Sequence, residues 1–230
     1  MISGDEVGNA IRLTLPDGIV FAGGLIVHGQ SELFDEEREA LSQAAPNRRR
    51  EFRAGRTYGR TALGALGFRA GPILVGPERA PLWPSGAVAS ISHCDSYCGV
   101  LAARAQTYAS VGLDIESAAP LAENVVSLIC SDPELRDRSE IESHIGIGLP
   151  KLIFSIKECV YKSYATVTRC FLDFADLHIV VDPDRRSFVG HLVNDDRPSA
   201  EESRTFCGTF LTIGDLVIAW TAMPRNRSAS

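Results

Sequence analysis

The order of secondary-structure signals along the chain is the feature that most constrains its fold. Strand-like segments are expected near 19–28, 87–92, 97–103 and 108–115, and helices from Ser31 to about Gln43 and from Pro46 towards Gly67. The second half has helices near 121–130 and 150–166, then strands near 176–182, 186–193, 205–213 and 215–222. Helices followed by meandering strands, twice over, predict an α+β fold of two similar packed half-domains, each with helices against an antiparallel sheet.

The chain is long enough to bury one large core or two small ones, because 45% of its 230 residues are hydrophobic. We expect an N-terminal half-domain over residues 1–117, a C-terminal half-domain over 118–224 and a flexible tail over 225–230. The polar segment from Ser131 to Ser143 predicts a mobile surface loop or a short helix. The cleft between the halves is the expected place for a site.

Charge, hydropathy and cysteine usage exclude several classes of protein. The net charge of −6 argues against a general nucleic-acid binder, which needs a broad basic face. The apolar stretch from Ile19 to Val27 is too short for a membrane span, and no basic segment precedes it as in a signal peptide. The six cysteines lack CxxC spacing and indicate reduced thiols. We therefore expect a cytoplasmic enzyme without a membrane partner.

Two acidic signatures carry the chemistry. In a Gly-Leu-Asp-Ile-Glu motif, Asp114 and Glu116 lie two residues apart, so both carboxylates leave one face of a strand. Glu158, flanked by Lys157 and Lys162, lies in an apolar-periodic stretch typical of a helix. Such an all-oxygen ligand set suits Mg²⁺ with open positions for phosphate oxygens, rather than zinc. The alternatives are a strand-end turn and an exposed helix acid paired with Lys162.

Basic residues concentrate between Arg48 and Arg60, where six of the chain's 23 lysines and arginines fall within thirteen positions. Arg49, Arg53, Arg56 and Arg60 recur at spacings of 4, 3 and 4, which predicts one stripe on a helix. A solvated basic face is the ordinary interpretation of such a stripe. Its concentration in an acidic chain favours binding of a multiply charged anion, because arginine offers forked donors to phosphate oxygens.

A predicted strand ends in Ser92-His93, after turn residues that include Trp83-Pro84. The serine hydroxyl, the imidazole and backbone N–H groups at a strand end could together bind a phosphate. A hydrolase pair is geometrically poor, because neighbouring residues on a strand point to opposite faces. A metal site of His93, Cys94 and Cys98 lacks further ligands at zinc-like spacing.

In this order and at these separations, the motifs resemble the 4′-phosphopantetheinyl transferases of the Sfp/EntD type. The resemblance is carried by Arg48-Arg49-Arg50-Glu51-Phe52, Trp83-Pro84, Ser90-Ile91-Ser92-His93, Gly112-Leu113-Asp114-Ile115-Glu116, and Lys157-Glu158 with Tyr161-Lys162. It implies a pseudo-dimeric monomer with coenzyme A in the cleft between its halves. It also implies transfer of the phosphopantetheine arm to a serine of an acyl or peptidyl carrier protein, with release of adenosine 3′,5′-bisphosphate.

The resemblance further implies roles for the acidic motifs. Asp114, Glu116 and Glu158 would hold Mg²⁺, for which Mn²⁺ is a substitute. Glu158 would also take the proton of the attacking serine, directly or through water. Lys157 or Lys162 would offset the remaining charge of the pyrophosphate.

For the basic motifs, the resemblance implies binding of the nucleotide. Arg48, Arg56 and His93 match positions that bind the adenosine 3′-phosphate, with Arg53 as a further member. Many relatives carry a lysine before the Trp-Pro, and this chain has none there. Arg79 or the arginine helix would take its place. Two rival functions stay open: a non-catalytic module that binds coenzyme A or carrier protein, and a Mg²⁺-dependent nucleotide phosphohydrolase.

Overall fold

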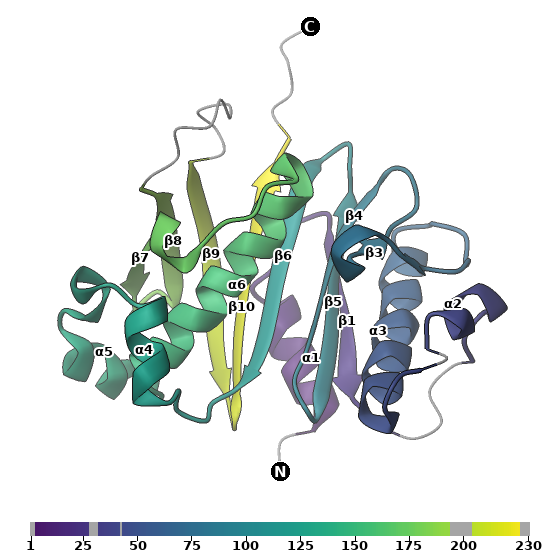
Figure 1. Cartoon of the computed structure of the whole chain (residues 1–230). Coiled ribbons are helices and arrows are strands. Elements are labelled where there is room, and N and C mark those ends of the chain that lie inside the picture. Colours follow the sequence, from purple (N-terminus) through teal and green to yellow (C-terminus); the bar gives the residue numbers. More distant parts are fainter. Residues whose placement is uncertain (1–2, 28–31, 42, 194–203, 226–230) are drawn as a thin grey trace, which may run out of the picture. The chain divides into compact units, whose positions relative to one another are not determined.

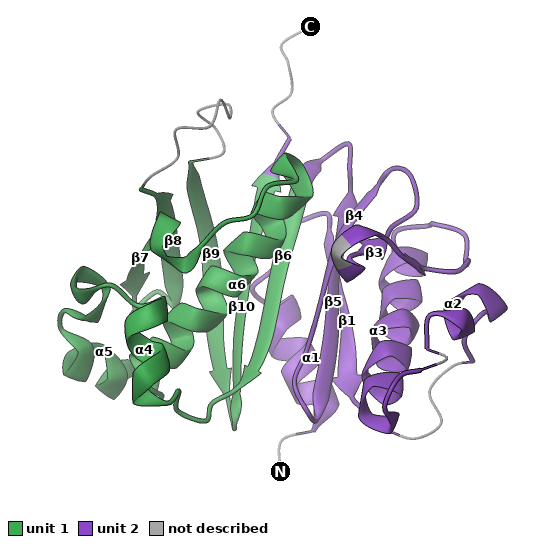
Figure 2. Cartoon of the chain, viewed as in Figure 1, with its two compact units in different colours: residues 1, 110–223 green, residues 2–109, 224–230 purple. Residues whose placement is uncertain are grey.

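The computed structural model describes residues 3–27, 32–41, 43–193 and 204–225. It divides into two compact units, which Figure 2 colours separately. Unit 1 comprises residues 1 and 110–223, and unit 2 comprises residues 2–109 and 224–230. This division falls earlier than the boundary predicted at 117/118, because the acidic strand joins the sheet of the second half. Apart from Arg225, the predicted tail lies outside the described residues.

Unit 2 packs a long helix against an antiparallel sheet (Figure 1). Its helices are α1 (Gly4–Arg12), α2 (Asp35–Glu39) and α3 (Pro46–Ala65), with the 3₁₀ turn η1 (Pro77–Arg79). The sheet has the order β1 (Ile19–Leu25), β5 (Tyr97–Arg104), β4 (Ala87–His93). A separate hairpin pairs β2 (Leu74–Val75) with β3 (Pro81–Leu82).

Helix α3, which carries the arginines, is delimited at both ends by its sequence. Pro46 occupies the first turn, where its missing N–H would have no helical acceptor. Gly67, just beyond the last helical residue, has a φ of 81°, the left-handed conformation that glycine adopts at low cost. Small side chains let the helix lie close to the sheet. The cluster consists of Ala62 with Ala22, Ala89, Val100 and Ala102.

Unit 1 is built around a five-stranded sheet and one long helix (Figure 1). Its helices are α4 (Glu123–Ile129), α5 (Arg138–Ile145) and α6 (Leu149–Thr168), with the 3₁₀ turns η2 (Asp132–Leu135) and η3 (Phe174–Asp176). The sheet order is β6 (Tyr108–Ser117), β10 (Leu216–Pro224), β9 (Thr205–Ile213), β8 (Ser187–Leu192), β7 (Leu177–Asp182). The pairs β10–β9, β9–β8 and β8–β7 are antiparallel.

Helix α6 supplies a large part of the core of unit 1. Its buried side chains recur at helical spacing, as the sequence predicted. They are Leu149, Leu152, Ile153, Ile156, Cys159 and Val160, and they share one cluster with Phe188, Phe206 and Phe210 of the sheet. Because one face of α6 is fixed against the sheet, the side chains on its other positions have defined places from which to act.

The α+β fold with helices against antiparallel sheets is confirmed in each unit, and most predicted elements are present. The helix expected from Ser31 is shorter, since α2 begins at Asp35, and Ser31 itself lies outside the described residues. The segment expected as a loop or short helix contains η2 and most of α5. Helix α1 was missed, although Ser3 and Glu6 cap it reciprocally, a signal visible in the sequence. No helix in the described ranges combines the length and apolar character of a membrane span.

Candidate active site

The two strand carboxylates lie on β6 and face helix α6. Their spacing predicted a common face, and the structure confirms it, because Asp114 and Glu116 both bond to side chains of that helix. Gly112 permits the close approach of strand and helix. A β-carbon at this position would collide with the backbone carbonyl of Cys159. The glycine of the motif therefore sets how near the carboxylates come to α6.

Asp114 is held by two side chains of α6 and has 4% of its own side chain exposed. Its Oδ1 accepts a hydrogen bond from Lys162 Nζ at 2.7 Å, and its Oδ2 accepts one from Ser155 Oγ at 2.8 Å. Lys162 Nζ also donates to the carbonyl oxygen of Leu113 at 3.0 Å. Burial by itself would lower the pKa of Lys162, but Asp114 and Glu158 outweigh burial and raise it. Lys162 is therefore a fixed cation at neutral pH.

Glu116 pairs with a lysine that the sequence motifs did not single out. Lys151 Nζ lies 2.7 Å from Glu116 Oε2, and only 8% of the Lys151 side chain is exposed. The ammonium also lies 5.1 Å from the ring centroid of Phe154. Lys151 precedes Glu158 by seven residues, or about two helical turns. That spacing on α6 is the signal by which sequence reasoning could have found it.

Glu158 on α6 is partly buried among charged groups. Burial raises the pKa of Glu158, Lys162 lowers it, and Asp114 and Glu116 raise it further. The three predicted carboxylates thus lie within electrostatic range of one another in unit 1. Their negative charges repel, and the neighbouring lysines offset that repulsion only in part.

The acidic cluster has the donor chemistry of a Mg²⁺ site without being arranged as a finished one. Within the described ranges, no three His, Cys, Asp or Glu side chains stand close enough to hold a metal ion. The reason is visible in the contacts, because Lys162 lies against Asp114 and Lys151 lies against Glu116. The carboxylate oxygens and the repulsion that raises the pKa of Glu158 fit a hard divalent cation. Such an ion would join the lysine ammonium groups or replace them.

Lys157, which was predicted to meet the pyrophosphate, instead has three acceptors inside unit 1. Only 2% of its side chain is exposed. Its ammonium donates to the Ile129 carbonyl at 2.8 Å, the Phe174 carbonyl at 2.9 Å and the Glu134 carboxylate at 3.0 Å. An ammonium has three hydrogens, so these bonds use all of its donors. The predicted contact with a ligand stays a prediction, and the structure gives Lys157 a buried ion pair with Glu134.

A cavity of about 260 Å³ opens beside Glu158. Apart from the charged side chains of Lys157, Glu158 and Asp173, its walls are apolar and aromatic. The remaining lining residues are Tyr161, Phe171, Leu172, Phe174 and Leu177. The Tyr161 and Phe171 rings stand edge to face with centroids 5.8 Å apart. The cavity therefore joins a candidate acid–base group to an apolar surface.

In unit 2, the structure brings together two residues that the sequence predicted for anion binding. Arg48 at the start of α3 and His93 at the end of β4 are joined by a 3.3 Å contact between Nη1 and Nε2. Glu51 was not predicted to take part, yet its Oε2 lies 3.4 Å from Arg48 Nη1 and 3.7 Å from His93 Nε2. Its position three residues after Arg48 was the available signal. Ser92 is buried on β4.

The predicted arginine stripe is not one uniform surface. Arg49 and Arg53 are exposed, whereas Arg56 is buried and donates from Nε to the carbonyl of Ile73 at 2.8 Å. Arg60 bonds to a buried carboxylate, with 12% of its side chain exposed. The stripe turns inward along α3 because the chain before and after this helix supplies acceptors. Arg79, the proposed replacement for the missing lysine, is exposed at the end of η1.

Comparison with known families gives two matches in sequence order. Residues 36–103 match the 4′-phosphopantetheinyl transferase N-terminal domain, and residues 110–221 match the 4′-phosphopantetheinyl transferase superfamily. The gap between the two matches contains the division between the units.

Individual relatives carry the same description. The 4′-phosphopantetheinyl transferase Svp of Streptomyces mobaraensis is 34% identical over 206 residues, which cover 86% of this chain and 84% of the relative. The transferase Npt of Nocardia iowensis is 31% identical over 172 residues, 75% of this chain and 77% of Npt. Enterobactin synthase component D of Salmonella typhi is 34% identical over 142 residues, 60% and 57% of the two chains. Because the family matches fall in both units and Svp aligns with most of the chain, this protein belongs to the 4′-phosphopantetheinyl transferase family.

Proposed function

We propose that this protein transfers the 4′-phosphopantetheine arm of coenzyme A to a serine hydroxyl of an apo acyl or peptidyl carrier protein. The observation that carries the proposal is the carboxylate and lysine cluster of β6 and α6, in a chain of this transferase family. The serine oxygen forms a bond to the phosphorus that bears the pantetheine. The bond from that phosphorus to the bridging pyrophosphate oxygen breaks, and adenosine 3′,5′-bisphosphate leaves.

Glu158 and Lys162 would serve this step from neighbouring turns of α6. Glu158 would accept the serine proton, directly or through a water, and its raised pKa makes it a stronger base than an exposed glutamate. Lys162 is protonated and fixed against Asp114, so it would offset negative charge on the pyrophosphate oxygens. Lys157 would contribute to that charge only by giving up one of its bonds within unit 1.

Asp114, Glu116 and Glu158 would hold Mg²⁺, with Mn²⁺ as a substitute. When bound, the ion supplies charge neutralisation for the pyrophosphate and its leaving oxygen. The protein's own part is to keep three carboxylates on facing elements, two on β6 and one on α6. Ser155 helps by orienting the buried Asp114 carboxylate.

The basic residues of unit 2 would bind the adenosine end of coenzyme A. Arg48, Arg56 and His93 would take the 3′-phosphate, with Arg53 and Ser92 as further contacts. The contact between Arg48 and His93 supports this assignment, since the two side chains already share one place. In unit 1, the cavity beside Glu158 would accept the pantetheine arm, because its apolar walls match the methyl and methylene groups of that arm. We propose a cytoplasmic monomer without nucleic-acid or membrane partners.

The test is to mix the protein with coenzyme A, Mg²⁺ and an apo carrier protein, then weigh the intact carrier. The carrier should gain one phosphopantetheine group. Asp114→Asn and Glu158→Gln should each lower the rate by at least about a hundredfold, because each removes a charged metal ligand or base. Glu123→Gln, an exposed acid on α4, is the matched control and should keep the wild-type rate. If either variant retains more than about a tenth of that rate, its assigned role is wrong.

The same experiment separates the two rival functions. A non-catalytic module would bind coenzyme A and leave the carrier mass unchanged. A phosphohydrolase would release a nucleotide from coenzyme A when no carrier is present. The acids and lysines of the cluster favour transfer over the first rival, because a binding module has no need of a base beside a fixed cation.

A further inference from the structure

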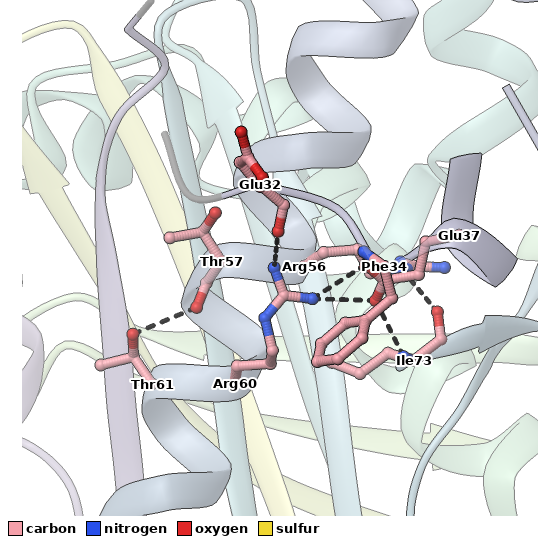
Figure 3. A network of polar contacts seen from close by, with 8 residues as sticks. All are labelled: Glu32, Phe34, Glu37, Arg56, Thr57, Arg60, Thr61 and Ile73. Atoms are coloured by element: carbon pink, nitrogen blue, oxygen red, sulfur yellow. Dashed lines mark hydrogen bonds and ion pairs between the residues drawn. The ribbon is translucent and has the colours of Figure 1, made fainter. Parts of the chain in front are cut away.

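Glu37 of helix α2 is a buried carboxylate at the centre of a polar network (Figure 3). None of its side chain is exposed. Both of its oxygens lie 2.9 Å from Arg60 Nη1. Oε1 also accepts from the backbone N–H of Ile73 at 2.9 Å, and Oε2 accepts from the N–H of Phe34 at 3.0 Å. Four hydrogen bonds from three residues therefore fix the carboxylate.

Ile73 connects this carboxylate to Arg56. The N–H of Ile73 bonds to Glu37, while its carbonyl oxygen accepts from Arg56 Nε at 2.8 Å. Ile73 is 1% exposed, so neither bond competes with bulk water. Glu37 therefore fixes the position of the carbonyl that orients the Arg56 guanidinium. Figure 3 shows the three residues in that sequence.

Arg56 is arranged as a side chain that needs an anion. Its guanidinium lies 3.9 Å from the ring centroid of Phe52, and in the described ranges its one hydrogen bond is the one from Nε. Burial lowers the pKa of Arg56 to about 10, Glu37 opposes that change, and Arg48 and Arg60 add to it. The guanidinium stays charged at neutral pH. Glu37 already bonds to Arg60, so it does not neutralise Arg56 directly.

We propose that Glu37 is a positioning residue for phosphate binding, which acts through the backbone of Ile73 to aim the Nη1 and Nη2 donors of Arg56 at a phosphate. The inference rests on the proposed function, in which that phosphate is the 3′-phosphate of coenzyme A. Only Nε of Arg56 is used by the protein fold, so two donor groups remain for a forked contact. Glu37 touches no ligand and would change affinity by changing the direction of these donors.

A purely structural Glu37 makes a different prediction from a positioning one. Loss of a structural bond would lower the stability of unit 2 and weaken all nucleotides equally. Loss of a positioning bond would weaken only ligands that carry the 3′-phosphate. The two roles are therefore separated by the ratio of two affinities, for adenosine 3′,5′-bisphosphate and for adenosine 5′-monophosphate.

The experiment measures both dissociation constants by calorimetry for the full-length wild type, Glu37→Gln and Arg56→Ala. In the wild type, the 3′-phosphate should improve affinity by roughly ten- to 150-fold, the range of a charge-assisted contact. Arg56→Ala should lose most of that preference. Glu37→Gln should lose about three- to tenfold of it, because a misdirected charge-assisted hydrogen bond is weakened rather than removed. The double variant should lose no more than Arg56→Ala alone.

Two further variants keep the test decisive. Glu36→Gln, an exposed neighbour on α2, is the matched control and should keep the wild-type ratio. If Glu37→Gln does not fold, Glu37→Asp keeps the charge but withdraws it by one methylene, and should also lower the ratio. An unchanged ratio in the folded Glu37 variants overturns the inference, and so does a wild type that ignores the 3′-phosphate. Failure to modify a carrier would instead overturn the proposed function, since these affinities are measured without turnover.

Discussion

Each unit buries one glutamate in the same kind of setting, Glu37 in unit 2 and Glu134 in unit 1. Each accepts a hydrogen bond from the backbone N–H three residues before it, another from a backbone N–H of a distant segment, and an ion pair from the unit's long helix. The donors are Phe34, Ile73 and Arg60 for Glu37, and Ser131, Ile179 and Lys157 for Glu134. In both units a buried acid thus ties a short helix, a distant backbone segment and the long helix together.

The two pairs differ in the cation and in what lies beside it. Lys157 spends its three donors inside unit 1 and has 2% of its side chain exposed, next to the candidate base Glu158. Arg60 keeps 12% exposed and lies four residues beyond Arg56 on α3. The same arrangement therefore steadies a proton acceptor in one unit and an anion-binding arginine in the other. The comparison teaches that conserving charge inside a unit is a means of aiming a neighbouring side chain.

Removing the cations should give the largest effect and should separate the two pairs. Lys157→Met leaves Glu134 charged and without its cation in a site with almost no access to water, which should cost about 3–5 kcal/mol of unfolding free energy. Arg60→Met should cost less, because water can reach Glu37 through the partly exposed Arg60 position. Urea denaturation of both variants measures the difference.

A double variant identifies the cause of that loss. Lys157→Met with Glu134→Gln removes both charges, so much of the stability lost in Lys157→Met should return. A double variant as unstable as the single one would show that the lysine contributes through its bonds to the carbonyls of Ile129 and Phe174 instead. Equal losses for Lys157→Met and Arg60→Met would remove the distinction between the pairs.

Much of the fold and the outline of the site could be predicted from the sequence, for reasons specific to the residues. The period of a strand placed Asp114 and Glu116 on one face, and the apolar spacing of α6 placed Glu158 on a helix. Local patterns of this kind need no knowledge of distant contacts. The order of the motifs then indicated the family.

The buried acids could not be predicted in this way. In the sequence, Glu37 and Glu134 look like ordinary acids near the start of a helix, which are common on exposed surfaces. Their burial depends on Ile73 and Ile179, segments brought to them only by the tertiary fold. The partner of Lys157 was missed for the same reason.

Two glycines sharpen the comparison at the next smaller scale, because each lets another part of its unit approach closely. At Gly112, an added β-carbon would meet the backbone carbonyl of Cys159 on α6. At Gly59 on α3, it would meet the end of the Ile73 side chain at 2.8 Å and the Trp83 ring at 3.3 Å. A backbone group cannot rotate away, whereas a side-chain end can.

Gly112→Ala should therefore cost about 1–3 kcal/mol of stability and lower transfer activity, because β6 would shift away from α6. Gly59→Ala should cost less, since alanine favours the helical conformation by about 1 kcal/mol over glycine and so offsets the overpacking. Thermal or urea denaturation together with a carrier-modification assay measures both. A larger loss for Gly59→Ala would mean that the segment at Ile73 is more rigid than the interface between β6 and α6.

The smallest effect is expected at Glu51, the acid beside Arg48 and His93. Its contacts of 3.4 Å and 3.7 Å join side chains that keep 22–40% exposure. Ion pairs with that much exposure contribute less than about 1 kcal/mol, so Glu51→Gln should leave stability nearly unchanged. Under the proposed function, this carboxylate repels the 3′-phosphate, and its removal should strengthen binding of adenosine 3′,5′-bisphosphate by up to about fivefold. Binding of adenosine 5′-monophosphate should not change. This sign is the opposite of the one expected for Glu37→Gln, because Glu51 lies against residues proposed to bind the anion while Glu37 acts behind one of them. A weaker bisphosphate affinity in Glu51→Gln would show that Glu51 aligns Arg48 and His93, and would place both acids in the same role.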